Sequence, residues 1–155
     1  MLHRDLKPAN ILVHIPSLKK TSKEFDYDAY VKSLNFAGSP EDDDDGAPLT
    51  EIVVKIADLG ESRNLNYGEM ATTFAGSPLY MAPEILLGRS HNHAADVWGI
   101  GCVFYYLLTG LSPFMALSEG QLRKKLRHGT YYFPKTVKLS CEGLTFLGKC
   151  LLFEF

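Results

Sequence analysis

The stretch HRDLKPAN, residues 3–10, is the most informative part of the sequence. It places a carboxylate, Asp5, close to a lysine, Lys7, and an amide, Asn10. Three other short groups follow it: Asp58-Leu59-Gly60 after a short β-branched run, Ala82-Pro83-Glu84, and Asp96-Val97-Trp98 at the start of an apolar run. A lone Asp or Asn usually marks a turn. Four such groups in this order and context are too specific for a chance arrangement.

The composition is that of a globular chain. Of its 155 residues 46% are hydrophobic and 22% are charged, which is enough for a single domain with a real core. A net charge of −2 gives no electrostatic reason to expect binding to nucleic acid or to a membrane surface. The odd number of cysteines, Cys102, Cys141 and Cys150, argues against a disulfide framework. We expect reduced core thiols and a cytoplasmic or nuclear protein without a membrane-inserted segment.

Helices dominate the expected secondary structure. We predict helices within 82–88, 96–110, 117–129 and 140–152, from proline and glycine boundaries, apolar spacing and an N-cap at Ser140. The helix at 96–110 is apolar on nearly every side, so we expect it to be the central element, buried all round. Short strands at 11–13 and 52–57 should form a small hairpin. The predicted fold class is mainly α with small β-hairpins.

Residues 14–51 interrupt this pattern. They contain lysines, the acidic run Glu41–Asp45 and several turn residues without apolar periodicity. Such a composition predicts a flexible, solvated insert, with a short amphipathic helix at 25–36. Long loops cost little entropy, so a hairpin can tolerate the extra length at its tip.

The HRDLKPAN stretch resembles the catalytic loop of the eukaryotic protein kinases, and the three later groups match the family's motifs in order. The resemblance covers residues 1–155 except for the insert 14–51, and it corresponds to the C-terminal lobe of a kinase, a partial protein-kinase-like α+β fold. Lys7 in DLKPAN is typical of the serine/threonine kinases. GSPLYMAPEIL, with TYYFPKTVKLS later in the chain, is similar to the unc-51-like, autophagy-initiating group.

The resemblance implies ATP-dependent phosphorylation of serine or threonine in protein substrates. Asp5 then takes the place of the catalytic base and Lys7 contacts the transferred phosphate. Asn10 and Asp58 supply oxygen ligands for Mg²⁺, a hard cation. Leu12 is expected in the apolar column beneath the adenine of ATP, together with Val103 and Leu107, although plain core is an equally good interpretation of all three. Leu59 replaces the usual Phe, and we interpret it as a minor apolar variant.

The segment from Asp58 to Glu84 resembles an activation loop and a substrate-binding loop. Ser77 is then expected to bond Asp5 and Lys7, while Phe74, Pro78 and Met81 line a pocket for the residue after the phosphoacceptor. Thr73 lies where an activating kinase adds phosphate in the family, and Arg4 and Arg63 match the residues that bind that phosphate. Two threonines, Thr72 and Thr73, also fit an ordinary loop.

Two further residues have structural roles in the family. Asp96 is expected to accept backbone N–H bonds from the catalytic loop, and Glu84 pairs with an arginine in a segment that follows. His91 and His93 could bind a metal, but two histidines without further ligands more often mark a solvated loop.

The pentapeptide FAGSP occurs twice, at 36–40 and at 74–78. Only the second copy precedes Tyr-x-Ala-Pro-Glu, so only it belongs to the predicted substrate loop. The first copy is a coincidence, a mimic that competes with the substrate loop, or a phosphorylation site at Ser39.

The family's nucleotide-gripping N-terminal lobe has no counterpart in these residues. We therefore expect a C-lobe fragment of an enzyme, whose own activity is open. The alternative is a non-catalytic kinase lobe that acts as a binding or regulatory module.

Overall fold

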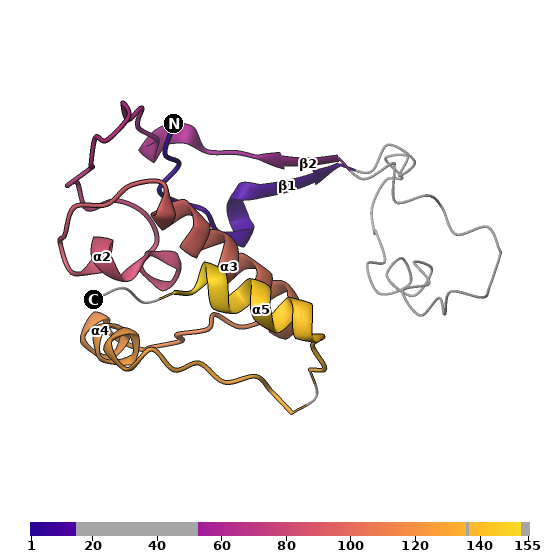
Figure 1. The fold of residues 1–155 in the computed structure, drawn as a ribbon. Helices are drawn as coiled ribbons and strands as arrows, with labels where there is room; N and C mark the ends of the chain where they lie inside the picture. The colour runs from indigo at the N-terminus through magenta and orange to yellow at the C-terminus, as the bar shows by residue number, and fades with distance from the viewer. Residues whose placement is uncertain (15–52, 136, 153–155) are drawn as a thin grey trace. The chain divides into compact units, whose positions relative to one another are not determined.

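The computed structural model of the chain describes residues 1–14, 53–135 and 137–152 (Figure 1). Its internal contacts divide it into two units, Met1–Ile11 with Ile56–Phe155, and Leu12–Lys55. Residues 15–51 of the predicted insert, with its expected helix and the first FAGSP copy, lie outside the described residues. That prediction therefore stays a prediction.

A two-stranded sheet follows the HRDLKPAN stretch. Strand β1, Ile11–His14, pairs with β2, Val53–Ile56, as the β-branched runs predict. Most residues of both strands are exposed. Directly beside the sheet, the Ala57 N–H donates to the Asn10 carbonyl at 2.9 Å. This bond brings the next residue, Asp58, close to the end of the HRDLKPAN stretch, which is the expected catalytic loop.

Four helices make up most of the described secondary structure after the sheet (Figure 1). They are α2 (Pro83–Leu86), α3 (Ala94–Thr109), α4 (Glu119–His128) and α5 (Cys141–Cys150). Single 3-10 turns precede them at Pro8–Asn10, Leu59–Glu61 and Pro78–Tyr80. All four predicted helices are present.

The helix ends follow from their capping residues. The hydroxyls of Ser118 and Ser140 accept backbone N–H bonds in the first turns of α4 and α5. Gly110 and Gly129 end α3 and α4 in the left-handed conformation. Helix α3 begins earlier than Asp96 because the Asn92 side chain accepts from the Ala94 N–H at 2.9 Å.

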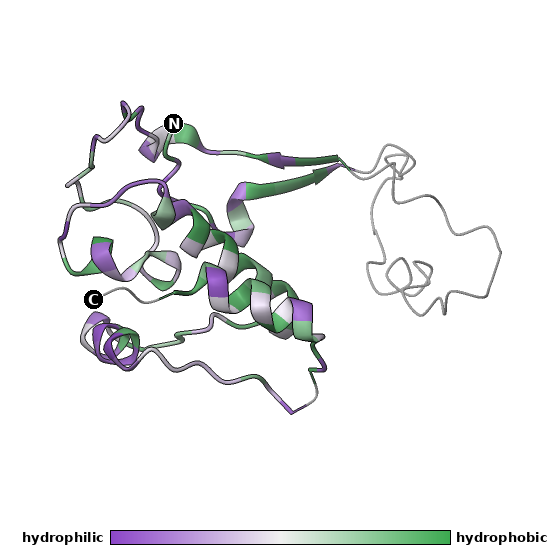
Figure 2. Cartoon of the chain, in the orientation of Figure 1, coloured by the Kyte–Doolittle hydropathy of each residue, from purple (hydrophilic) through white to green (hydrophobic). Residues whose placement is uncertain are grey.

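The hydrophobic core lies around α3, whose sequence is mostly apolar (Figure 2). The stacked rings of Trp98 and Phe114 lie 5.5 Å apart, and α4 contributes the buried Leu122 and Leu126. The other core members are Met81, Ala82, Ile85, Leu86, Ala95, Cys102, Tyr105, Leu147 and Leu151. Helix α5 packs along α3 (Figure 1).

The prediction that this helix is buried all round is wrong. Val97 is 44% exposed, Ile100 46% and Leu107 73%. These residues recur at helical spacing, so they form one exposed stripe, while the other sides of α3 face the core and α5. Apolar sequence shows that a helix can be buried, but the neighbouring elements decide which side is.

The cysteine prediction holds for two of the three thiols. Cys102 and Cys150 are buried, whereas Cys141 is exposed at the first position of α5, which corrects the expectation of three core thiols. Burial raises the pKa of the Cys102 thiol far above its usual range, so that thiol stays protonated. Within the described residues, no helix has the length and apolar character needed to cross a bilayer.

Candidate active site

The carboxylate of Asp96 supports the backbone of the expected catalytic loop. Asp96, in the first turn of α3, accepts the backbone N–H groups of His3 at 2.8 Å and of Arg4 at 2.9 Å. These bonds support an unusual backbone, because Arg4 has a φ of 71°, a conformation that costs non-glycine residues energy. The expected role of Asp96 as acceptor is confirmed by these contacts.

The loop also packs directly on α3. A side chain at Gly99 would place its Cβ 2.9 Å from the Cβ of Leu6. Glycine at this position therefore allows the catalytic loop to lie against the helix. Nothing in the sequence motifs pointed to Gly99, because its role depends on which segment crosses the helix.

The carboxylate of Asp5 lies at the centre of a hydrogen-bond network. It accepts from the Lys7 Nζ at 2.7 Å, from the Ser77 backbone N–H at 2.8 Å and from the Asn10 Nδ2 at 3.1 Å. Only 8% of its side chain is exposed. Burial by itself raises the pKa of Asp5, but the bonds from Lys7 and Ser77 outweigh it and hold this pKa below its usual value of 3.8. Asp5 is therefore an ionised acceptor at neutral pH.

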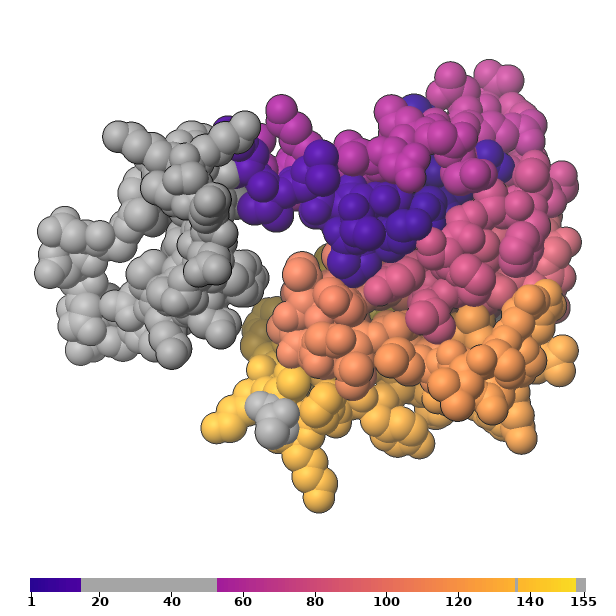
Figure 3. Space-filling model, turned by 180° about the vertical axis from the view of Figure 1, so that it is seen from behind, coloured from indigo at the N-terminus to yellow at the C-terminus, as the bar shows by residue number. Residues whose placement is uncertain are grey.

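Lys7 and Ser77 join the catalytic loop to the later FAGSP copy. The Lys7 Nζ donates to the Ser77 Oγ at 2.8 Å as well as to Asp5. The expected contacts of Ser77 with Asp5 and Lys7 are thus both present. They bring residues 70 positions apart into one cluster, and Figure 3 shows the N-terminal residues, in indigo, packed beside the magenta and pink segment that follows β2.

Gly76 allows this close approach. Its φ is 108°, and a Cβ at this position would lie 2.3 Å from the carbonyl oxygen of Arg4. Any other residue would therefore clash with the catalytic loop and strain the backbone. The pentapeptide FAGSP by itself gives no reason for the glycine, and the contact with the Arg4 carbonyl supplies it.

Asn10 and Asp58 are the two expected magnesium ligands. The Asn10 Nδ2 also donates to the Asp5 carbonyl at 2.9 Å, which fixes the amide in the buried loop. Asp58 has a left-handed φ of 62° and is exposed, and within the described residues its carboxylate accepts from the Gly60 N–H alone, at 3.4 Å. An amide oxygen and a carboxylate are hard donors of the kind that Mg²⁺ takes. The donor chemistry fits the cation.

The described residues contain no cluster of three or more His, Cys, Asp or Glu that could hold a metal. His91 is only 2% exposed, so the interpretation of a solvated loop is wrong for this residue. Its backbone pairs with Ala71 in an antiparallel bridge, and its ring Nδ1 lies 3.3 Å from the Arg89 carbonyl oxygen. His93 is exposed just ahead of α3.

The expected phosphate-binding arginines lie on paired segments. Leu2 and Arg63 form an antiparallel bridge, and the Arg4 Nε donates to the carbonyl of Glu61. The Arg4 Nη1 is buried without a hydrogen-bond partner among the described residues. Thr73 is exposed in the loop between Ala71 and Gly76.

The expected substrate-loop side chains differ in exposure. Phe74 is 53% exposed and Pro78 opens a 3-10 turn, whereas Met81 is 4% exposed and belongs to the core. The Ser112 hydroxyl, which the sequence did not single out, donates to the Leu79 carbonyl at 3.1 Å and holds this turn against the helical core.

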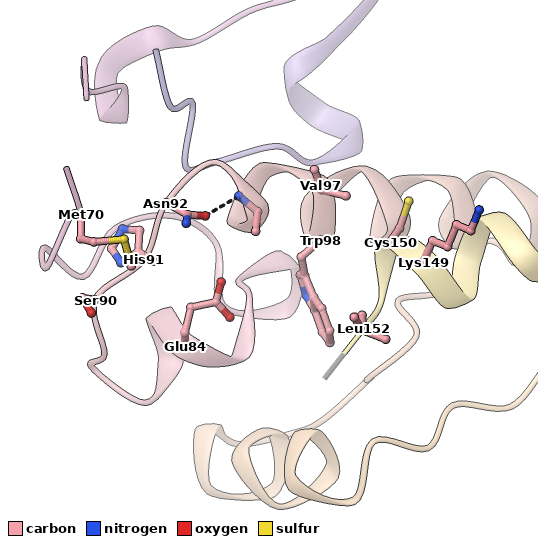
Figure 4. A pocket seen from close by; sticks show the side chains of 11 residues that line it. Met70, Glu84, Ser90, His91, Asn92, Val97, Trp98, Lys149, Cys150 and Leu152 are labelled. Carbon is pink, nitrogen blue, oxygen red and sulfur yellow. Dashed lines mark hydrogen bonds between the residues drawn. The ribbon is translucent and has the colours of Figure 1, made fainter. Parts of the chain in front are cut away.

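Glu84 lines a pocket of about 360 Å³ beside the start of α3 (Figure 4). The buried Nε2 of His91 has no partner among the described residues, and within them Glu84 forms no ion pair. The other lining residues include Met70, Ser90, Asn92, Trp98 and Lys149. Glu84 therefore still offers its carboxylate to a cation.

The predicted adenine column is heterogeneous in its exposure. Val103 is 7% exposed, whereas Leu12 is 53% and Leu107 is 73% exposed. Leu59, which replaces the usual Phe, is 51% exposed. Its 3-10 turn follows directly on Asp58, whose backbone is left-handed.

Comparison with known proteins identifies the family of this chain. The family model described as protein kinase domain matches residues 1–154. The serine/threonine-protein kinase unc-51 of Caenorhabditis elegans is 35% identical over 90% of this chain, ATG1 of Candida glabrata is 35% identical over 94%, and ULK1 of Homo sapiens is 37% identical over 79%. The chain spans only 12%, 15% and 9% of their lengths. The resemblance read from HRDLKPAN is confirmed: the chain belongs to the protein kinase family and is similar to its unc-51, ATG1 and ULK1 members.

Proposed function

We propose that this chain is the C-terminal lobe of a serine/threonine kinase, which transfers the γ-phosphoryl group of ATP to a protein hydroxyl. The observation that carries the proposal is the cluster of Asp5, Lys7 and Ser77, with Nζ–carboxylate and Nζ–hydroxyl distances of 2.7 and 2.8 Å. An ionised, buried carboxylate next to an ammonium group is what such a transfer needs from a protein.

In this mechanism the Asp5 carboxylate orients the substrate hydroxyl and accepts its proton. The hydroxyl oxygen forms a bond to the γ-phosphorus as the bond from phosphorus to the bridging oxygen of ADP breaks. Lys7 can turn from Asp5 toward the transferred group, because 25% of its side chain is exposed, and it then stabilises the developing negative charge. Asn10 holds Asp5 in place through the bond from its Nδ2.

Asn10 and Asp58 would hold Mg²⁺, which neutralises the charge of the phosphates when it is bound. Asp58 suits this role because its carboxylate is exposed and, among the described residues, accepts one weak bond. Its left-handed backbone is the kind of local strain that often marks a functional position.

The same proposal assigns the loop between Asp58 and Glu84 to regulation and substrate binding. An activating kinase phosphorylates Thr73, and Arg4 and Arg63 bind the phosphate. The exposed ring of Phe74 and the turn at Pro78 contact the substrate next to its phosphoacceptor. Met81, buried beneath that turn, supports it.

The test is Asp5→Asn in the natural polypeptide that carries this sequence, assayed for transfer of phosphate from ATP to a serine peptide. Loss of a positioned base should lower kcat by about 10²- to 10⁴-fold. Glu119→Gln is the matched control, because it removes an exposed carboxylate whose side-chain partner is Arg123. Equal kcat in both variants and the wild type would rule out the proposed role of Asp5.

A second candidate function is a non-catalytic binding module. The exposed stripe of Val97, Ile100 and Leu107 on α3 favours it, because apolar surface of this kind suits a protein partner. Binding of ATP that depends on Mg²⁺ and is lost in Asp58→Asn supports the enzyme. Partner binding that is lost in Ile100→Asp, together with the absence of nucleotide binding, supports the module.

A further inference from the structure

The arginine after Asp58-Leu59-Gly60 is already engaged by a carboxylate. The Arg63 Nη2 lies 2.8 Å from the Glu69 Oε1, and both side chains are partly exposed, at 40% and 33%. The second oxygen of Glu69 accepts the backbone N–H of Asn66 at 3.0 Å and its Nδ2 at 3.2 Å. The pair thus closes a small turn, in which the Glu69 N–H also donates to the Asn66 carbonyl at 3.0 Å.

The backbone beneath Arg63 is fixed. Its N–H and carbonyl pair with Leu2 at 2.9 and 2.8 Å, and Arg4, two residues along, reaches the carbonyl of Glu61. Because Leu2 lies opposite Arg63 in this antiparallel bridge, Arg4 and Arg63 are diagonal neighbours. The two guanidinium groups therefore start from adjoining segments, one bound to a carboxylate and the other with a buried, unused Nη1 among the described residues.

Thr73 belongs to a short loop that is tied at both ends. Ala71 pairs with His91, and Gly76 packs on the carbonyl of Arg4. Three residues span at most about 11 Å, so the Thr73 backbone stays within that distance of Gly76 and of its contact with the Arg4 backbone. A phosphate on Thr73 would enter a region whose second arginine, Arg63, already has an anionic partner.

We propose that Glu69 is an internal competitor of the Thr73 phosphate for the Arg63 guanidinium, so that it sets how firmly the phosphorylated loop is held. This rests on the phosphate site proposed above. A phosphate carries a charge of about −1.5 to −2 and three acceptor oxygens, so it can displace a single carboxylate. Until it does, the Glu69 charge repels it and occupies one of the donors of Arg63.

A purely structural role for Glu69 makes a different prediction. If its carboxylate only closes the turn with Asn66, then glutamine, which keeps one oxygen acceptor, should leave the phosphate unaffected. If Glu69 competes for Arg63, removing its charge should strengthen the bond between phosphate and arginine. The protonation of the phosphate itself reports this bond, because a nearby cation lowers its second pKa.

The experiment is a phosphorus NMR pH titration of the full chain with phosphothreonine at position 73, introduced by semisynthesis. We expect the second pKa of the phosphate to be lower in Glu69→Gln than in the wild type by roughly half a pH unit. Glu69→Ala, which removes the side-chain oxygens altogether, should also lower the phosphate pKa. Glu61→Gln removes a neighbouring carboxylate that has no side-chain partner in the described chain, and it should change the value much less.

Arg63→Ala separates the inference from the proposal beneath it. If Arg63→Ala raises the phosphate pKa while the two Glu69 variants match the wild type, the phosphate site stands and the competition is disproved. If the wild type titrates like free phosphothreonine and Arg63→Ala changes nothing, the phosphate site itself is wrong and the inference fails with it. If Glu61→Gln and Glu69→Gln lower the phosphate pKa equally, the shift reflects only the net charge of the region, and this outcome also overturns the proposal.

Discussion

Two residues of this chain, Arg4 and Asp58, share the same strained backbone but differ in what supports it. Both are non-glycine residues with positive φ, 71° and 62°. The Arg4 loop is held by two backbone bonds to Asp96 and by the packing of Leu6 on α3. Asp58 is exposed, and in the described part of the chain it has a long bond from the Gly60 N–H alone. The catalytic loop is thus ordered by the protein itself, whereas the Asp58 turn depends on little within the described chain.

This difference suggests a division of labour. The groups proposed to handle the proton and the substrate hydroxyl are preorganised, which would lower the cost of aligning them during the reaction. The carboxylate assigned to the metal is left with unused oxygen lone pairs. In general such strain persists at functional positions because a ligand or the surrounding fold stabilises it.

The largest effect should come from breaking the support of the catalytic loop. Asp96→Ala leaves two backbone N–H groups without their charged acceptor and leaves the Arg4 strain unsupported. We expect the free energy of unfolding to fall by about 4 kcal/mol, measured by urea denaturation. Glu119→Gln, at an exposed carboxylate of α4, is the control and should change it by less than about 0.5 kcal/mol. A loss as small as the control's would show that Asp96 does not support the loop.

Gly76→Ala should have the next largest effect. Its Cβ would meet the Arg4 carbonyl at 2.3 Å, and its φ of 108° disfavours any side chain, so we expect a loss of about 3 kcal/mol. Gly120→Ala is the matched control, because that helical glycine has open space around its Cβ position. It should stabilise the protein by about 0.5 to 1 kcal/mol. Similar thermal stability for both alanine variants contradicts the close contact between the two loops.

The pH dependence of stability should separate Asp5 from exposed carboxylates. Because its pKa is lower in the folded chain than its ordinary value of 3.8, Asp5 stabilises the fold above that value. This contribution is lost as the pH falls below about 4 and through the folded pKa. Wild type should therefore lose more stability than Asp5→Asn on acidification across this window, in parallel urea titrations. Identical slopes would mean that Lys7 and Ser77 do not stabilise the charge.

The smallest effect should be a gain in stability and not a loss. Asp58→Gly removes the cost of a left-handed backbone at an exposed position, so we expect the protein to gain about 0.5 kcal/mol of stability. The same change should abolish binding of Mg²⁺, measured by calorimetry with ATP present. Destabilisation by Asp58→Gly would show that this turn is as firmly supported as the catalytic loop, and the contrast between the two would not hold.

Much of the local structure could be predicted from the sequence. Helix ends are marked by residues with local preferences: the side chains of Ser118 and Ser140 cap helix starts, and Gly110 and Gly129 adopt the left-handed conformation at helix ends. Helices α4 and α5 therefore begin and end almost where expected. The motif order predicted the family, and the resemblance correctly placed Ser77 against Asp5 and Lys7. These features depend on neighbouring residues or on patterns that the whole family shares.

Other features were decided only by the tertiary structure. Contacts between segments far apart in the sequence decide which side of α3 is covered and why Gly76 and Gly99 have no side chain. The folded chain also decides which carboxylate engages Arg63. Hydropathy and propensity describe a residue with its neighbours along the chain, while burial and pairing describe it with its neighbours in space. The sequence by itself determined the family, the helices and the chemistry available at Asp5, Lys7, Asn10 and Asp58. The tertiary structure decided which of these groups are held in place before any ligand arrives, because only packing and long-range hydrogen bonds fix a side chain.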